Sequence, residues 1–235
     1  MRCPRRWAAV LALLPLLAAA VGAAAGDGAQ PAPATIELPA TTAPAEAEPA
    51  PAPTPAAWAF SASTYAYILP QGGDYVNPNL TADRDWLHLE ARYNYEALDT
   101  GSLWLGYNLS WGEELTLGLT PMLGGVFGHL NGVAPGYLVS AGYGGLALSG
   151  QGEYVFDTGM GSGSFFYSWT ELSYAPIDWG RIGVVIQRTN AYHSDLDVQR
   201  GLLVGFSHGP LQLTTYVFDI GQADPTVVLG LVASF

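Results

Sequence analysis

The sequence predicts an all-β fold: a transmembrane antiparallel β-barrel of about twelve strands, preceded by a signal peptide and a disordered Pro/Ala-rich linker. Three observations predict it. Short runs of alternating apolar and polar residues fill the chain from Trp58 to the terminal Phe235, and none repeats apolar residues at helical spacing. A secretory signal precedes them, and aromatic residues gather near the ends of the runs, where membrane barrels place them. A soluble β-sandwich would also alternate, but the signal, the terminal strand and the aromatic placement favour the barrel.

Residues 1–25 have the parts of a secretory signal, which are a basic start, an apolar run over 7–21 and small residues at A-x-A spacing. The basic and small residues are Arg2, Arg5, Arg6, Ala23 and Ala25. A membrane anchor is the alternative, but a run of fifteen residues that contains Pro15 is shorter than the roughly 20 residues of a spanning helix. Cys3, the only cysteine, lies in this segment, so we expect no disulfide in the mature chain.

The segment 26–57 is rich in proline and alanine and has few large apolar side chains. Proline fixes φ and has no amide donor, so this composition disfavours a stable helix or a central strand. We expect a semi-extended periplasmic linker. The alternative is that it also binds a periplasmic partner.

The remaining residues, 58–235, are expected to form the barrel. The predicted strands lie near 58–69, 75–83, 86–97, 102–111, 114–127, 137–143, 146–157, 164–175, 181–190, 198–207, 211–219 and 226–235. An even number places both ends of the barrel on one side of the membrane. The second strand contains Pro78, which argues against a central strand; without it the count would be eleven.

The connections between these strands are expected to differ in length at the two ends. Short turns fall at 83–85, 112–113, 144–145, 177–180 and 208–210. Mostly longer connections fall at 70–74, 128–136, 158–163, 191–197 and 220–225, with a short one at 99–101. Short turns on the periplasmic side and longer loops outside are typical of outer-membrane barrels.

The last ten residues form the most regular predicted strand, because Val227, Leu229, Leu231, Ala233 and Phe235 occupy every second position. A terminal Phe, an apolar residue two before it and Gly230 at the sixth position from the end resemble the C-terminal recognition strand of Gram-negative outer-membrane β-barrel proteins. Ala233 is weakly apolar, and Val228 stands where a polar residue is more usual. The resemblance implies that Gly230, Leu231, Ala233 and Phe235 form the signal that the barrel-insertion machinery recognises.

The predicted strand 86–97 separates its two faces most clearly. Leu87, Leu89, Ala91, Tyr93 and Tyr95 alternate with His88, Glu90, Arg92, Asn94 and Glu96. A charge facing lipid costs about 2–4 kcal/mol at the membrane midplane, so we expect the polar row to line the lumen. The same reasoning places Gln151, Glu153, Tyr167, Trp169 and Glu171 inside. The carboxylates outnumber Arg92, so the lumen is expected to be acid-rich, either water-filled or closed by Arg92 bridging Glu90 and a facing glutamate.

Two arginines fall on the opposite face. Counting from Ile182 and from Phe206 places Arg188 and Arg200 on the lipid side, near the outer rim. They are expected either to contact lipopolysaccharide phosphates or to be turned inward by β-bulges.

The charge balance excludes a general nucleic-acid binder. Of eight basic residues three lie in the signal, which leaves five arginines and no lysine against twenty acidic residues. Acidic residues near the outer loops could hold divalent cations at the lipopolysaccharide surface. The four histidines lack metal-ligand spacing, and we expect no cofactor, no metal and no catalytic residues. Asn190, His193 and Ser194 are the nearest approach to a hydrolase site, but adjacent loop residues do not supply the geometry of a catalytic triad.

The sequence therefore predicts a protein of the Gram-negative outer membrane, in contact with its lipid and lipopolysaccharide, with the linker in the periplasm. A narrow passive pore for small solutes is the first functional expectation. The alternative is a closed barrel that acts as an anchor or a surface-interaction module, and the third is a lipid-modifying enzyme.

Overall fold

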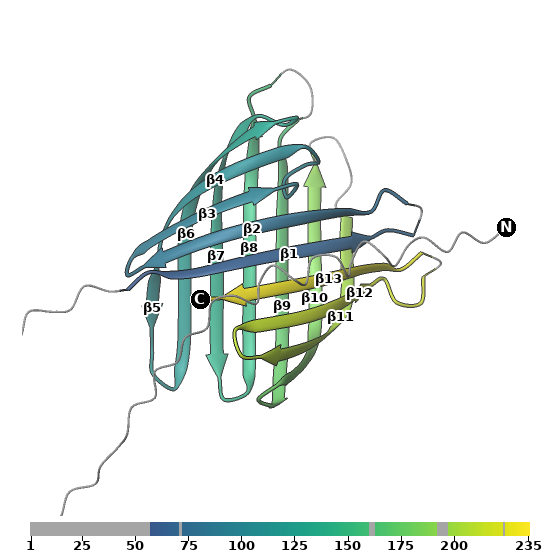
Figure 1. The fold of residues 1–235 in the computed structure, drawn as a ribbon. Helices are drawn as coiled ribbons and strands as arrows, with labels where there is room; N and C mark the ends of the chain where they lie inside the picture. Colours follow the sequence, from purple (N-terminus) through teal and green to yellow (C-terminus); the bar gives the residue numbers. More distant parts are fainter. Residues whose placement is uncertain (1–56, 71, 160–162, 192–196, 223) are drawn as a thin grey trace, which may run out of the picture. The chain divides into compact units, whose positions relative to one another are not determined.

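The computed structural model describes residues 57–235, except for 71, 160–162, 192–196 and 223. This region is built of antiparallel strands (Figure 1). Their bounds are β1 (Ala59–Ile68), β2 (Tyr75–Arg84), β3 (Leu87–Tyr93), β4 (Thr100–Tyr107), β5 (Leu109–Trp111), β6 (Leu115–Gly128), β7 (Gly132–Tyr143), β8 (Leu146–Asp157), β9 (Phe165–Ile177), β10 (Gly180–Ala191), β11 (Asp197–His208), β12 (Leu211–Phe218) and β13 (Thr226–Ser234). Among the described residues, no helix is long and apolar enough to cross a membrane.

The sheet closes on itself. Except for β4 and β5, each strand pairs with its neighbours in sequence; β1 pairs with β13, and β4 and β5 both pair with β6. Because β4 and β5 are two parts of one strand interrupted at Asn108, the sheet is a closed barrel of twelve strands, which confirms the predicted fold. The last β4 pair is Gly106 with Met122, and the first β5 pair is Leu109 with Leu119. Pro121 of β6 therefore lies in the stretch opposite the interruption. Proline has no amide to donate across this gap.

Pro78 is accommodated for a similar reason. It lies opposite Thr64 of β1, whereas pairing of β2 with β3 begins only at Asn79. The missing amide therefore leaves no gap in the β2–β3 ladder, and the second strand exists as expected.

Two strand ends differ from the sequence-based expectation by more than two residues. β7 begins at Gly132, so most of the loop expected at 128–136 is strand. Pro135 pairs with Leu123 on one side, while on the other side pairing with β8 omits Ala134 and Pro135. The proline thus sits at a local irregularity instead of in a loop. β3, by contrast, ends at Tyr93 instead of continuing to residue 97.

The two ends of the barrel have different connections. At the end that holds Ala59 and Ser234, the connections β2–β3, β5–β6, β7–β8, β9–β10 and β11–β12 span two or three residues. At the opposite end most connections span five to seven residues, and the shortest, at 129–131, spans three. We call these the short-turn end and the long-loop end.

The outer face of the barrel is apolar. Exposed aliphatic side chains cover the middle of the strands, among them Leu80, Leu89, Leu103, Leu105, Leu123, Leu148, Leu172, Val184, Leu202 and Leu213. Aromatic side chains flank them at the short-turn end, where Trp86 stacks with Tyr107 at 5.5 Å between ring centroids and Trp179 stacks with Phe206 at 6.1 Å. An apolar band bordered by aromatic residues is the surface that a barrel presents to lipid.

The interior is filled unevenly along the barrel. Near the long-loop end two apolar clusters are buried, one around Tyr67, Phe218 and Val228, the other around Val126, Leu130 and Val155. Near the short-turn end the inward residues of β8 are small, and Ala147 and Ser149 are exposed. The interior is therefore wider at the short-turn end.

Candidate functional site

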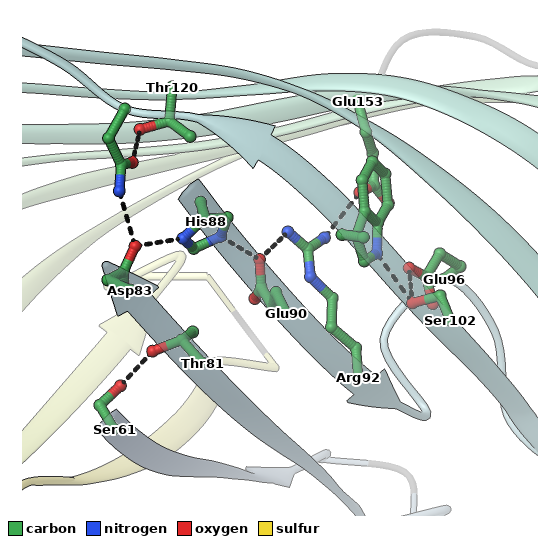
Figure 2. A network of polar contacts seen from close by, with 12 residues as sticks. Ser61, Thr81, Asp83, His88, Glu90, Arg92, Glu96, Ser102, Thr120 and Glu153 are labelled. Atoms are coloured by element: carbon green, nitrogen blue, oxygen red, sulfur yellow. Dashed lines mark hydrogen bonds and ion pairs between the residues drawn. The ribbon is translucent and has the colours of Figure 1, made fainter. Parts of the chain in front are cut away.

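A row of charged side chains follows the inner face of β3. His88, Glu90 and Arg92 occupy alternate positions, and Arg92 donates to Glu90 at 2.8 Å and to Glu153 of β8 at 2.7 Å. Because β3 and β8 are not neighbours in the sheet, the bond to Glu153 crosses the interior (Figure 2). The side chains of Arg92, Glu90 and Glu153 are 1%, 8% and 2% exposed. Arg92 thus bridges Glu90 and a facing glutamate, as expected for a closed lumen.

The row continues toward the short-turn end. His88 Nε2 lies 3.5 Å from Glu90 Oε2, and its Nδ1 lies 2.8 Å from Asp83 Oδ1. Asn108, at the interruption between β4 and β5, donates to the same Asp83 oxygen at 2.8 Å and accepts from Thr120 at 2.7 Å. The break in the fourth strand therefore places an amide where it extends the polar row, which we call the β3 ladder.

Aromatic rings enclose the guanidinium of Arg92. It lies 4.4 Å from the ring centroid of Tyr95 and 4.5 Å from that of Trp104, within cation–π range. Trp104 fits because Gly124 lies beneath it: a Cβ at Gly124 would come within 2.5 Å of the indole. Neither aromatic contact was predicted. Strict alternation had placed Tyr95 on the lipid side, which is wrong, because β3 has ended before it and the chain turns inward.

The turn after β3 explains the positions of two further predicted residues. Asn94 has a positive φ of 56° and lies in the connection, where its side chain donates to the carbonyl of Val76 and accepts from the amide of Asp99. It stabilises the turn and is not part of the β3 ladder. Glu96 is buried and accepts from Ser102, whose hydroxyl in turn accepts from the Trp104 indole at 2.9 Å.

A second polar cluster surrounds Glu171 of β9. One carboxylate oxygen accepts from Trp169 and from Tyr216, each at 2.8 Å, and the other accepts from Arg181 at 3.2 Å. Arg181 also donates to Thr214 at 2.9 Å. Arg92 was the cation expected in the lumen, and Arg181 was not predicted there. Because Ile182 is expected to point outward, strict alternation places its neighbour Arg181 on the inner face.

A cavity of about 230 Å³ lies between the β3 ladder, the Glu171 cluster and the two apolar clusters. Its wall contains five aromatic side chains, Tyr65, Tyr67, Tyr95, Tyr167 and Trp169, together with Asn77, Gln151 and Glu171. Ser149 and Gln151 line it on the side of the short turns, where the interior widens. Four of the residues expected in the lumen, Gln151, Tyr167, Trp169 and Glu171, therefore share one cavity.

The remaining predicted residues lie apart from this cavity. In β13, Gly230 pairs with Tyr65, whose ring would come within 2.9 Å of a Cβ at Gly230. Leu231 follows Gly230, so its side chain lies on the opposite face of the strand, where it is half-buried. Ala233 is buried between β1 and β12. Phe235 is 70% exposed and stacks on Phe60 at 6.2 Å.

Arg188 and Arg200 are exposed on the face that carries Val184 and Leu202, and the pairing of β10 with β11 is continuous there. No bulge turns them inward. His193 and Ser194 lie outside the described residues. Among the described residues, no group of three or more His, Cys, Asp or Glu side chains is arranged to hold a metal ion.

No family model matches the sequence, and no curated protein matches it. Solved structures are similar in fold. A KdgM porin in complex with disordered oligogalacturonate aligns with a TM-score of 0.54 and 10% identity, over 74% of this chain and 99% of that chain. A second KdgM porin structure aligns with a TM-score of 0.53, also at 10% identity and with the same coverage. Omp33 of Acinetobacter baumannii aligns with a TM-score of 0.46 and 8% identity, over 76% and 98%. The chain thus has the fold of outer-membrane β-barrel porins.

Proposed function

We propose that this protein is a narrow passive pore for small solutes in the Gram-negative outer membrane. The observation that carries the proposal is the cavity of about 230 Å³ within a closed barrel that is wider at its short-turn end. A twelve-stranded barrel encloses more space than an eight-stranded barrel, whose side chains can fill it. The cavity and the small inward residues at the short-turn end supply the beginning of a solute path. The similarity in fold to KdgM porins supports this assignment.

The charges of the interior favour cations over anions in such a pore. Four glutamates, Glu90, Glu96, Glu153 and Glu171, face two arginines, and both arginines are engaged by carboxylates. The terminal nitrogens of both guanidiniums already donate to a carboxylate or to Thr214, so an anion would find only their buried Nε donors free. We therefore propose selectivity for neutral or cationic solutes.

The test is conductance of the purified protein in a planar bilayer. Discrete openings with cation selectivity are expected. Replacing Glu153 and Glu171 together with Gln should lower that selectivity, while the matched double variant Glu113→Gln, Glu114→Gln, in an exposed turn, should leave it nearly unchanged. Equal selectivity in the wild type and the Glu153/Glu171 variant would contradict the acid-lined path.

A closed barrel that serves as an anchor is the second candidate. The observation that favours it is the bridge from Arg92 to Glu90 and Glu153, because all three side chains are buried, together with the apolar clusters at the long-loop end. If the wild type conducts at no voltage and the Glu153/Glu171 variant unfolds more easily, the protein is an anchor whose lumen is blocked, and the pore assignment is wrong.

The orientation and the outer contacts complete the proposal. We place the short-turn end in the periplasm, with the linker at 26–57 following a cleaved signal at 1–25, where it could bind a periplasmic partner. Arg188 and Arg200 then lie near the outer leaflet, where their guanidiniums would bind lipopolysaccharide phosphates. Gly230, Leu231, Ala233 and Phe235 would be recognised by the insertion machinery.

A further inference from the structure

The cavity wall combines aromatic rings in different orientations. The rings of Tyr95 and Tyr167 meet edge to face, at 5.4 Å and an interplanar angle of 83°. Those of Tyr65 and Trp169 are tilted by 59° at 6.4 Å. Because these rings are not parallel, their faces point in several directions. Tyr67 already stacks on Tyr75, and Arg92 lies over Tyr95, which leaves Tyr65, Tyr167 and Trp169 to face a ligand. Such an arrangement is the cage that proteins use to bind quaternary ammonium groups by cation–π attraction.

The same wall contains a buried acceptor without a partner. Asn77 is 3% exposed, and its Oδ1 has no hydrogen-bond partner; the hydroxyl of Tyr95 also lacks one. Glu171 contributes a carboxylate. Beyond the wall, the acceptors Glu153 Oε1 and Glu96 Oε2 and the donors Arg92 Nε and Arg181 Nε are also buried without partners. A buried acceptor without a partner is costly, so Asn77 Oδ1 favours a ligand that brings a donor or a positive charge to the cavity.

An anionic ligand does not fit this charge balance. Arg92 is bonded to Glu90 and Glu153, and Arg181 is bonded to Glu171 and Thr214. Only the Nε donors of these arginines lack partners, and both are buried. To reach the terminal guanidinium nitrogens, a carboxylate or phosphate would have to displace one of their partners and leave it buried without a counterion. The cavity volume, about 230 Å³, is below the roughly 300–1,000 Å³ of pockets for drug-sized ligands, so the ligand must be small.

We propose that this cavity is a binding site for a small alkylammonium cation, held by cation–π contacts with Tyr65, Tyr167 and Trp169 and by the acceptor of Asn77. The site deepens the proposed pore function, on which its role in transport rests. The cation enters from the short-turn end, past Ser149 and Gln151. The carboxylate of Glu171 supplies the electrostatic attraction that a neutral ligand would not feel.

The test compares two probes of nearly the same shape by calorimetry on the full-length protein in detergent micelles. Choline carries a quaternary ammonium, and 3,3-dimethyl-1-butanol has the same branched head without the charge. Choline should bind at least about tenfold more tightly, the factor that about 1.4 kcal/mol of cation–π attraction gives. Equal binding of the two probes, or no detectable binding of choline, overturns the proposal without any variant being needed.

Variants locate the site. Tyr65→Leu should weaken choline binding by about threefold to tenfold, whereas Tyr65→Phe, which keeps the ring, should retain it. Tyr154→Leu, on the outer face of β8, is the matched control and should bind choline as the wild type does. Loss of binding in both leucine variants would place the site elsewhere. Choline binding without bilayer conductance would reject the pore and keep the site, and conductance without choline binding would do the reverse.

Discussion

Replacing Arg92 with methionine removes the guanidinium that holds two buried glutamates. Glu90 and Glu153 contact it at 2.8 and 2.7 Å, and their side chains are 8% and 2% exposed. Methionine is apolar and flexible enough to fill much of the vacated space, so the main change is the loss of charge and donors. Water has little access to either carboxylate in its place.

The magnitude follows from that burial. Removing one partner of a buried ion pair costs about 3–5 kcal/mol, because the remaining charge is left uncompensated. The contacts of Arg92 with Tyr95 and Trp104 are lost as well. We expect the free energy of unfolding to fall by about 3–5 kcal/mol. Adding Glu90→Gln and Glu153→Gln to the Arg92→Met variant should recover most of the loss, because no buried charge then lacks a partner.

Urea titration of the protein in lipid vesicles, followed by tryptophan fluorescence, measures the free energy of unfolding. Arg200→Met is the matched control, because it makes the same chemical change at an exposed site, where the expected effect is within about 1 kcal/mol. If Arg92→Met is no more destabilising than this control, the β3 ladder does not stabilise the barrel. The triple variant would contradict the reasoning if it were less stable than Arg92→Met alone.

Further predictions concern assembly, lipid contacts and packing. Deleting Phe235, or replacing Leu231 with Asp, should leave the protein as periplasmic aggregate; heat-modifiable folded protein in outer membranes from both variants would contradict the role of the terminal strand. Cysteines at 188 and 200, in place of Arg188 and Arg200, should react with a lipid-phase probe, and labelling only by a water-soluble lumen reagent would reject the phosphate contact. Gly124→Val should displace the indole of Trp104 and lower the free energy of unfolding by about 1–3 kcal/mol, measured in the same urea titration. Unchanged stability would mean that β4 shifts to make room for the larger side chain.

The barrel could be predicted from the sequence because its signals are local. Alternation identifies each strand, and turn residues mark its ends, so the closed twelve-stranded sheet follows from counting. Two of the differences involve proline. The loop expected at 128–136 includes Pro135, but whether proline fits a strand depends on which neighbour its missing amide faces, and that is a property of the assembled sheet. The break at Asn108, beside the position opposite Pro121, was hidden for the same reason.

The candidate site could be predicted only in part. Alternation places His88, Glu90 and Arg92 on one face, but it cannot state that Arg92 meets Glu153, because that contact depends on the stagger of strands that are not neighbours. At Asn94 the backbone adopts a positive φ, which resets the alternation and turns Tyr95 inward. The pattern alone gave no warning of this, although Asn is among the residues that adopt this conformation most readily.

The β3 ladder and the aromatic cavity divide the interior between stability and transport. Arg92, Glu90 and Glu153 are buried and bonded to one another, so most of their electrostatic energy stabilises the barrel and little of it reaches a passing solute. The cavity differs, since the buried Asn77 oxygen in its wall has no partner. A solute would therefore meet its strongest interactions at the cavity and its greatest steric resistance at the apolar clusters beyond it. Selectivity and flow would then depend on different residues, which is why binding in micelles and conductance in bilayers are separable measurements for this barrel.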